Sequence, residues 1–287
     1  MSTSVKIIEC PRDAMQGIKQ WIPTDKKVQY IQSLLRVGFD TIDFGSFVSP
    51  KAIPQMADTA EVLSRLDLTK TQSKLLAIIA NTRGAEEASK HQPINYLGYP
   101  FSISENFQMR NTHKTIAESV VTLQEILDVA NKVSKEVVVY ISMGFGNPYG
   151  DPWNVEIVGE WTEKLSTMGV KILSLSDTIG SSNPESIDYL FSNLIPKYSH
   201  IEFGAHLHTT PTTWFEKVDA AYKAGCRRFD GAIQGFGGCP MAKDELTGNM
   251  PTEKLLSYFT SKQSNQLNAL SFESAYNEAT KIFTVYH

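Results

Sequence analysis

The sequence has few cysteines, no long apolar run and no excess of basic residues, and each absence excludes a class of protein. Three of its 287 residues are cysteine, Cys10, Cys226 and Cys239, and this odd, scattered set does not suit the disulfide framework of a small secreted domain. A reducing, intracellular setting is the simpler expectation. No apolar segment approaches the ~18 residues of a membrane-spanning helix. The net charge of −4 gives no reason to expect nucleic acid or an anionic membrane surface as a partner.

The sequence also lacks signals that would target or divide the chain. Its N-terminal stretch MSTSVKIIECPRD enters an apolar, strand-like run within a few residues, so we expect neither a signal peptide nor a transit peptide. Together with the low cysteine content, this predicts a cytoplasmic protein. No change in composition marks a linker, so we expect residues 1–287 to form a single domain.

What the chain does have is an alternation of short β-rich runs and amphipathic helical patterns. With 41% hydrophobic and 20% charged residues, it can bury a sizeable core. Residues 24–38 are typical of the helical patterns, with Thr24 as N-cap and a closing glycine. Two further helical patterns, 252–262 and 272–283, follow the last strand. The eight expected strands cover residues 5–9, 39–44, 74–80, 94–102, 136–143, 170–177, 200–208 and 227–234.

The order of these elements indicates an α/β fold with a parallel sheet. Strands that are apolar along most of their length suit burial on both faces. Eight strand–helix units in a chain of this size fit a (β/α)8 TIM barrel, which typically has ~250 residues. A doubly wound open sheet is the main alternative, but the first strand is followed by CPRDAMQG, which lacks the glycine-rich fingerprint of that fold. We therefore predict a TIM barrel with extra C-terminal helices over about 252–287.

Polar residues are concentrated at the C-terminal ends of the expected strands, where a TIM barrel places its active site. Because alternate residues of a strand point the same way, the two histidines of GAHLH are expected to face one spot. The residues gathered at this rim are Arg12, Asp13, Gln16, Asp43, Ser46, Ser174, Ser176, Asp177, His206, His208, Cys239 and Asn249.

Some of these residues could hold a divalent cation. The two histidines could supply nitrogen ligands, Asp13 a carboxylate oxygen and Asn249 an amide oxygen, a set that suits Mg²⁺, Mn²⁺ or Zn²⁺ in a catalytic role. Each residue also has an ordinary structural interpretation: the histidines could bond to backbone, Asp177 could cap a helix, and Cys239 could be a packed thiol. Their gathering at one rim favours a metal-dependent enzyme.

Several segments of the sequence resemble the 3-hydroxy-3-methylglutaryl-CoA (HMG-CoA) lyases, a family of the DRE-TIM metallolyase superfamily. The resemblance covers nearly the whole chain in the family's order, and it is weakest between about 66 and 140. The segments that carry it are PRDAMQ (11–16), GFDTIDFGSFVSPKAIPQMAD (38–58), LSLSDTIG (173–180), HLH (206–208), and GFGGCP and TGNMPTEKL within 235–255.

The resemblance implies an activity and a set of site residues. This family cleaves HMG-CoA into acetyl-CoA and acetoacetate by a retro-Claisen step, using Mg²⁺ or Mn²⁺. By match to the family motifs, the metal ligands would be Asp13, His206, His208 and Asn249, and the catalytic residues would be Arg12, Asp43, His206 and Cys239. Arg12 would stabilise the enolate oxygen of the thioester, and Cys239 would transfer a proton. The residues that would line the substrate pocket are Arg12, Gln16, Lys19, Ser46, Ser174 and Asp177.

Three departures from the family pattern leave the acyl substrate open. Asp43 stands in place of a glutamate, Thr209 in place of an aspartate, and the stretch from Cys239 to Asn249 is one residue longer. One alternative is a related aldolase or acyl-CoA condensing enzyme that acts on another 3-hydroxy acyl substrate. A catalytically silent barrel that only binds a metabolite is another. For the enzymes, the expected partner is a small acyl-CoA, and the helices after 252 could form a homodimer interface.

Overall fold

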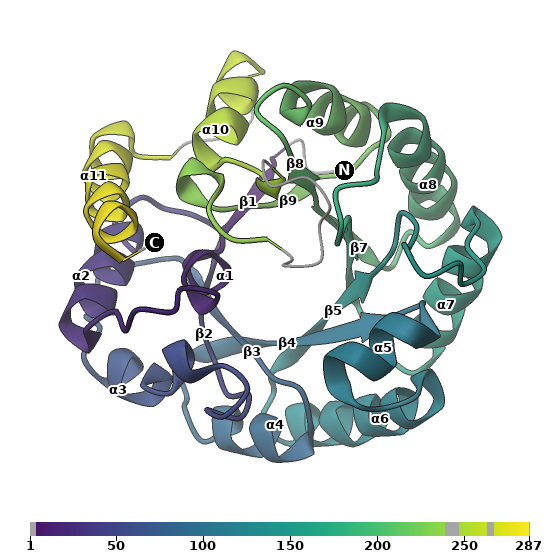
Figure 1. Ribbon diagram of the computed structural model, residues 1–287, viewed down its shortest axis with the longest axis horizontal. Helices are drawn as coiled ribbons and strands as arrows, with labels where there is room; N and C mark the ends of the chain where they lie inside the picture. The colour runs from purple at the N-terminus through teal and green to yellow at the C-terminus, as the bar shows by residue number, and fades with distance from the viewer. Residues whose placement is uncertain (1–3, 239–246, 263–266, 287) are drawn as a thin grey trace.

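Eight parallel strands close into a barrel at the centre of the molecule (Figure 1). The structure, a computed structural model, describes residues 4–238, 247–262 and 267–286. The order around the barrel follows the chain, and closure pairs the last strand with the first, with Lys6 opposite Arg228. This confirms the predicted TIM barrel. The strands are β1 (Lys6–Glu9), β2 (Thr41–Ser46), β3 (Lys74–Ile78), β4 (Ile94–Ser102), β5 (Glu136–Ser142), β6 (Ile172–Ser176), β7 (Glu202–His206) and β9 (Arg228–Gly231).

Helices surround the barrel and connect its strands (Figure 1). Capping residues begin several of them: the hydroxyl of Thr115 and the carboxylate of Glu118 form a capping box at α6, and Asn183 with Pro184 begins α8. The helices are α1 (Pro11–Gln16), α2 (Thr24–Leu34), α3 (Thr59–Ser64), α4 (Thr82–Ser89), α5 (Glu105–Thr112), α6 (Ile116–Lys132), α7 (Val155–Thr167), α8 (Pro184–Lys197), α9 (Trp214–Lys223), α10 (Thr252–Ser261) and α11 (Ala269–Tyr286). None of the helices in the described ranges is long and apolar enough to cross a membrane.

Two helical segments differ from the sequence-based expectation. The pattern over 53–66 forms a 3₁₀ turn, η1 (Pro54–Met56), and the separate helix α3. The Thr59 hydroxyl explains the break, because it donates to the carbonyl of Met56 and accepts the N–H of Ser46, which ties this point to β2. A short helix α5 also precedes α6, and it ends where His113 adopts a left-handed backbone conformation.

The seventh and eighth strands are shorter than predicted. The expected strand over 200–208 leaves the barrel after His206, and the two-residue strand β8 (His208–Thr209) pairs antiparallel with β10 (Gly248–Asn249). The expected strand over 227–234 ends at Gly231, because the chain turns into η2 (Ile233–Gly235) with Gln234 at a positive φ of 62°. The first of these changes places His208 and Asn249 in a small second sheet.

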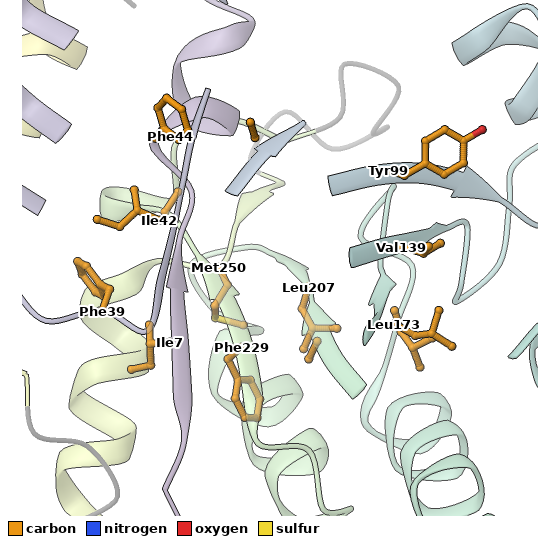
Figure 2. Close-up of a cluster of buried hydrophobic side chains, with 14 of the residues drawn as sticks. Ile7, Phe39, Ile42, Phe44, Tyr99, Val139, Leu173, Leu207, Phe229 and Met250 are labelled. Atoms are coloured by element: carbon orange, nitrogen blue, oxygen red, sulfur yellow. The ribbon is translucent and has the colours of Figure 1, made fainter. Parts of the chain in front are cut away.

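Apolar side chains fill the barrel on both faces of its strands. One cluster occupies the lumen and contains Leu76, Ile78, Tyr96, Val138, Tyr140 and Ile172. A larger cluster lies between the strands and the helices, and Figure 2 shows Ile42, Val139 and Leu173 among its members. The strands are buried on both faces, which explains why the sequence shows nearly continuous apolar runs rather than strict alternation.

The C-terminal helix α11 packs on α2 and on the end of the barrel. The ring of Phe283 meets Tyr30 edge-on at a centroid distance of 6.2 Å and stacks on Phe236 at 4.2 Å. Ala275 and Ala279 are fully buried on the same helix. The predicted C-terminal helices are therefore confirmed, with α11 longer than the expected 272–283.

Glu9 is a fully buried carboxyl group at the end of β1, and we predict that it makes the stability depend on pH. Its carboxyl oxygens accept the Ile233 N–H at 3.0 Å and the Thr252 hydroxyl at 2.6 Å. Burial raises its pKa from 4.5 to about 8. Because the pKa is raised in the folded state, the protonated carboxyl group of Glu9 contributes to the free energy of unfolding. This contribution is fully present below pH 4.5 and is lost as the pH rises through about 8.

Replacing Glu9 with glutamine should remove this pH dependence, because the amide is neutral and keeps an oxygen for the Ile233 N–H. Between these two pH values we expect the free energy of unfolding of the wild type to fall relative to Glu9→Gln, by about 1.4 kcal/mol per pH unit. Urea denaturation of both proteins at several pH values measures this difference. Parallel stability profiles for the two proteins would show that Glu9 is ionised in the folded state.

Candidate active site

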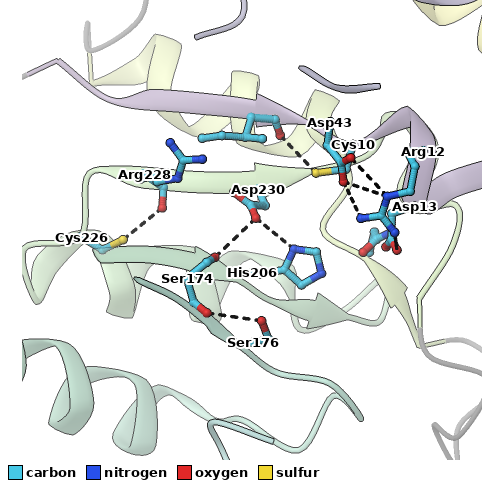
Figure 3. A network of polar contacts seen from close by, with 12 residues as sticks. Cys10, Arg12, Asp13, Asp43, Ser174, Ser176, His206, Cys226, Arg228 and Asp230 are labelled. Atoms are coloured by element: carbon cyan, nitrogen blue, oxygen red, sulfur yellow. Dashed lines mark hydrogen bonds and ion pairs between the residues drawn. The ribbon is translucent and has the colours of Figure 1, made fainter. Parts of the chain in front are cut away.

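Arg12 lies at the barrel mouth between two carboxylates. Pro11 begins α1 directly after β1, so Arg12 and Asp13 occupy the first turn of a helix that lies inside the ring of outer helices (Figure 1). The Arg12 guanidinium binds the Asp43 carboxylate of β2 through Nε at 3.0 Å and also through Nη2, and its Nη1 donates to Asp13 at 2.8 Å (Figure 3). Burial raises the pKa of Asp43 to about 6, although the charge of Arg12 opposes this shift. The carboxylates of Asp43 and Asp13 therefore hold the guanidinium group of Arg12 in a fixed position.

Asp13 accepts hydrogen bonds from three polar residues at the barrel mouth. Its Oδ1 accepts hydrogen bonds from Arg12 and from Gln16 Nε2, both at 2.8 Å, and its Oδ2 accepts one from Asn249 Nδ2 at 2.7 Å. Burial favours the neutral acid, but the charge of Arg12 and the interactions with His206 and Asn249 lower the pKa of Asp13 below its usual value. A carboxylate that stays ionised in a buried position is suited to bind a cation.

The two histidines face the same spot, as predicted, although they belong to different strands. Their ring centroids are 5.5 Å apart. His208 Nδ1 lies 3.0 Å from the carbonyl oxygen of Thr178 and so carries the proton, which leaves its Nε2 as an acceptor. Burial, with the nearby His206, lowers the pKa of His208 to about 4. His208 is therefore neutral at physiological pH, the form that binds metals.

These groups fit a divalent cation. One ligand atom each from Asp13, His206 and His208 lies within 4.8 Å of the other two. His208 Nε2 is buried and has no hydrogen-bond partner among the described protein atoms, which is unusual for a polar atom that serves only the fold. Asn249 lies beside this cluster and contacts Asp13 through its amide nitrogen, so the predicted role of its oxygen as a ligand stays a prediction.

Gly237 brings the loop after β9 onto this cluster. Its φ is +87°, and a Cβ atom there would lie 2.6 Å from the carbonyl oxygen of Asp13 and 2.8 Å from the side chain of Asn249. Only glycine allows so close an approach with this backbone conformation. Cys239, the predicted proton donor two residues further on, lies outside the described residues, and its role stays a prediction.

A cavity of about 380 Å³ opens in front of the cluster. One side carries the cation-binding candidates and hydroxyl groups, and the other side is apolar, so the cavity can hold a small acyl group with several oxygens. Its lining includes Arg12, Asp13, Gln16, Ser142, Ser176, Thr178, His206 and His208 on the polar side, and Val48, Ile53, Ile78 and Pro100 on the apolar side.

Four residues predicted to line the pocket do not contact this cavity in the described part of the chain. Lys19 is exposed, and Ser46 lines a different cavity near α4. Ser174 is buried, with its hydroxyl 3.4 Å from Asp230. The Asp177 carboxylate bonds the hydroxyl of Ser182 and lies 2.8 Å from the ammonium group of a buried lysine on α9. These positions suit supporting roles, and the predicted substrate contacts stay predictions.

Sequence reasoning missed three residues that contact the histidines. Asp230 of β9 lies 3.1 Å from His206 Nδ1, Thr178 bonds His208 through its carbonyl oxygen, and the ring of Tyr140 meets His206 edge-on at a centroid distance of 5.6 Å. Asp230 is the single acidic residue of the expected strand RRFDGAIQ, and this was the available signal for it. The other two contacts depend on barrel closure and had no local signal.

Comparisons with known proteins agree on one family. The model of the HMGL-like family matches residues 5–277. Hydroxymethylglutaryl-CoA lyase YngG of Bacillus subtilis is 33% identical over 246 residues, which are 86% of this chain and 81% of that protein. The hydroxymethylglutaryl-CoA lyase of Pseudomonas mevalonii is 32% identical over 254 residues, 88% of this chain and 83% of that protein.

Solved structures show the same relationship. A structure of the Bacillus subtilis HMG-CoA lyase superposes with a TM-score of 0.90 at 31% identity, covering 98% of this chain and 95% of that one. An Acinetobacter baumannii HMG-CoA lyase in complex with coenzyme A and 3-methylmalate superposes with a TM-score of 0.89 at 29% identity, covering 99% of this chain and 92% of that one.

Proposed function

This chain belongs to the HMGL-like family, and from this premise we propose that it cleaves HMG-CoA into acetyl-CoA and acetoacetate with the help of a divalent cation. The observation that carries the proposal is the cluster of Asp13, His206 and His208 beside the guanidinium of Arg12 at one cavity. Relatives that match most of this chain are named for the same activity. The substrate is accordingly a small acyl-CoA molecule.

The proposed cation would be held by Asp13 and by the Nε2 atoms of His206 and His208, with the amide oxygen of Asn249 as a further candidate. A bound Mg²⁺ or Mn²⁺ supplies positive charge that lowers the pKa of a substrate hydroxyl group. Zn²⁺ is also compatible with nitrogen and oxygen ligands of this kind. The pKa of His208, about 4, keeps its imidazole neutral and able to bind at physiological pH.

Arg12 is placed to stabilise the negative charge that develops on the thioester oxygen. Three of its five N–H groups bind Asp43 and Asp13, and within the described residues this leaves two for a ligand in the cavity. Because Asp43 holds the guanidinium in position, no reorganisation is needed when the carbon–carbon bond breaks. A donor fixed in this way stabilises the transition state more than the bound substrate.

An assay of acetoacetate release from HMG-CoA tests the proposal. We expect product with added Mg²⁺ or Mn²⁺, loss of product with EDTA, and recovery when the cation is restored. A panel of other short 3-hydroxy acyl-CoA esters, measured alongside, identifies the alternative of a related lyase or aldolase with a different acyl group. If another ester is cleaved with a higher kcat/KM than HMG-CoA, that ester replaces HMG-CoA as the proposed substrate. Cleavage that needs no metal would contradict the proposed site.

A further inference from the structure

Asp230 lies beside His206, on the neighbouring strand of the barrel. It belongs to β9, and its side chain is about 1% exposed. Its Oδ2 atom is 3.1 Å from His206 Nδ1, and the hydroxyl of Ser174 on β6 lies 3.4 Å from the same oxygen (Figure 3). Asp230 does not line the cavity among the described residues, and its carboxylate meets the imidazole at Nδ1.

A carboxylate at this position determines which nitrogen of His206 carries the proton. A neutral imidazole has one N–H donor and one acceptor, and an ionised carboxylate can only accept. The proton therefore resides on Nδ1, which leaves the lone pair of Nε2 for the cation. A metal-binding histidine whose other nitrogen donates to a carboxylate is both oriented and made a stronger ligand.

We propose that Asp230 is a positioning residue for the lyase reaction, which acts by holding His206 in the orientation and tautomer that bind the divalent cation. The inference rests on the proposed function, because it concerns the same cation. It goes further in assigning a role to a residue that does not line the cavity in the described part of the chain.

The two histidines differ in the group that accepts the hydrogen bond from Nδ1. His208 donates to the neutral carbonyl oxygen of Thr178, whereas His206 donates to a carboxylate. A charged acceptor makes a stronger hydrogen bond than a neutral one, so His206 is the more firmly held ligand and the better electron donor. Loss of Asp230 should therefore weaken cation binding through His206 specifically.

Arg228 compensates the charge of Asp230 in the lumen. It lies two residues earlier on the same strand, is 1% exposed, and donates from Nη1 to Glu202 at 3.3 Å. Burial would lower the pKa of this guanidinium, but the charge of Asp230 raises it. An ionised carboxylate is costly in a buried site unless an opposite charge lies near it, and Arg228 supplies such a charge on the same strand.

Cys10 lies near the same pair but does not compete for His206. Its sulfur, the His206 ring and the Asp230 carboxylate form a group whose ligand atoms are within 4.8 Å of one another. Its thiol donates to the carbonyl oxygen of Ile8, which lies 3.8 Å from the sulfur. The bond from His206 to Asp230 is accordingly the interaction that acts at Nδ1.

Binding of Mn²⁺ to the variant Asp230→Asn tests the proposal independently of turnover. Asparagine preserves the shape of the side chain and removes its charge. We expect the Mn²⁺ dissociation constant, measured from the electron paramagnetic resonance signal of free Mn²⁺, to rise roughly 10–100-fold. At saturating Mn²⁺ we expect kcat to fall while the KM for HMG-CoA changes little.

Two controls separate this role from a structural one. Glu9→Gln removes another fully buried carboxyl group of the barrel, and it should bind Mn²⁺ like the wild type. In the background of His206→Gln, adding Asp230→Asn should change the Mn²⁺ affinity little, because Asp230 acts through His206. A thermal melting midpoint for each variant verifies that it is folded.

The tautomer of His206 can also be measured directly on the wild-type protein. Nitrogen NMR of the metal-free protein, above the pKa of the imidazole, should show His206 protonated at Nδ1 and unprotonated at Nε2. The opposite tautomer would overturn the proposal, and so would a folded Asp230→Asn protein with unchanged Mn²⁺ affinity. If the wild type itself binds no Mn²⁺, the proposed cation site fails rather than the role of Asp230 within it.

Discussion

Replacing Arg12 with methionine is expected to lower kcat by about 10²–10³-fold at saturating cation, the usual loss when one donor to a developing oxyanion is removed. Methionine preserves much of the length of the side chain and removes every N–H group that could reach the thioester oxygen. The histidine ligands are untouched and Asp13 keeps its bonds from Gln16 and Asn249, so the Mn²⁺ dissociation constant should change much less than kcat does. Steady-state kinetics together with Mn²⁺ binding measure the two effects separately.

Arg12→Lys serves as the matched control for this prediction. It keeps the positive charge but cannot contact Asp43 with two parallel donors, so we expect activity between that of the wild type and that of Arg12→Met. Both variants weaken the support of Asp43, whose pKa is already raised to about 6 by burial. A methionine variant with wild-type kcat would contradict the role of Arg12 in the reaction.

Replacing Asp13 with asparagine is expected to reduce turnover by about 10³-fold at cation concentrations that saturate the wild type. The cation contributes several kcal/mol of charge stabilisation to reactions of this class, and each 1.36 kcal/mol corresponds to a tenfold change in rate. Asp13 is the single anionic group in the proposed ligand set, so its neutral analogue should bind Mn²⁺ much more weakly. Raising the Mn²⁺ concentration should then restore part of the activity.

The rescue by Mn²⁺ distinguishes a ligand from a residue that only shapes the site. Asp151→Asn, which removes a carboxylate that bonds Ser104 and Asn106 away from the cluster, should have wild-type Mn²⁺ affinity and activity. If Asp13→Asn binds Mn²⁺ as tightly as the wild type, the cation lies elsewhere, and the proposed set of ligands is wrong.

Asp43, one of the departures from the family pattern, contacts Arg12 and does not line the cavity among the described residues. The family resemblance implies a catalytic role for Asp43, and the structure turns its carboxylate toward Arg12. Its carboxylate is fully buried and does not line the cavity among the described residues. This geometry favours an action through the guanidinium, and the catalytic role of Asp43 stays a prediction.

The barrel and the gathering of polar residues at its mouth were predictable from local patterns. Apolar runs with helical stretches between them indicate buried parallel strands, and the ends of such strands meet at one rim. The pairing of Asp13 with the two histidines follows from that rule, without knowledge of any contact. The family resemblance supplied the roles of Arg12 and Cys239, which spacing did not indicate.

Contacts that depend on closure of the barrel were not predictable in the same way. The break after His206 occurs because His208 and Asn249 pair in a second sheet, and these residues are 41 positions apart in the chain. The bond between Asp230 and His206 likewise requires β7 and β9 to be neighbours. Neither contact leaves a periodic signal in the sequence near the residues concerned.

The sequence by itself determined the type of fold, the edge of the barrel where chemistry occurs and the residue types available there, because hydrophobic periodicity and strand ends are local properties. The tertiary structure decided which group lies beside Nδ1 of each histidine, which residues hold the guanidinium of Arg12, and which predicted residues face the cavity. These depend on the directions of side chains brought together from distant strands. Only the register of the closed barrel sets those directions.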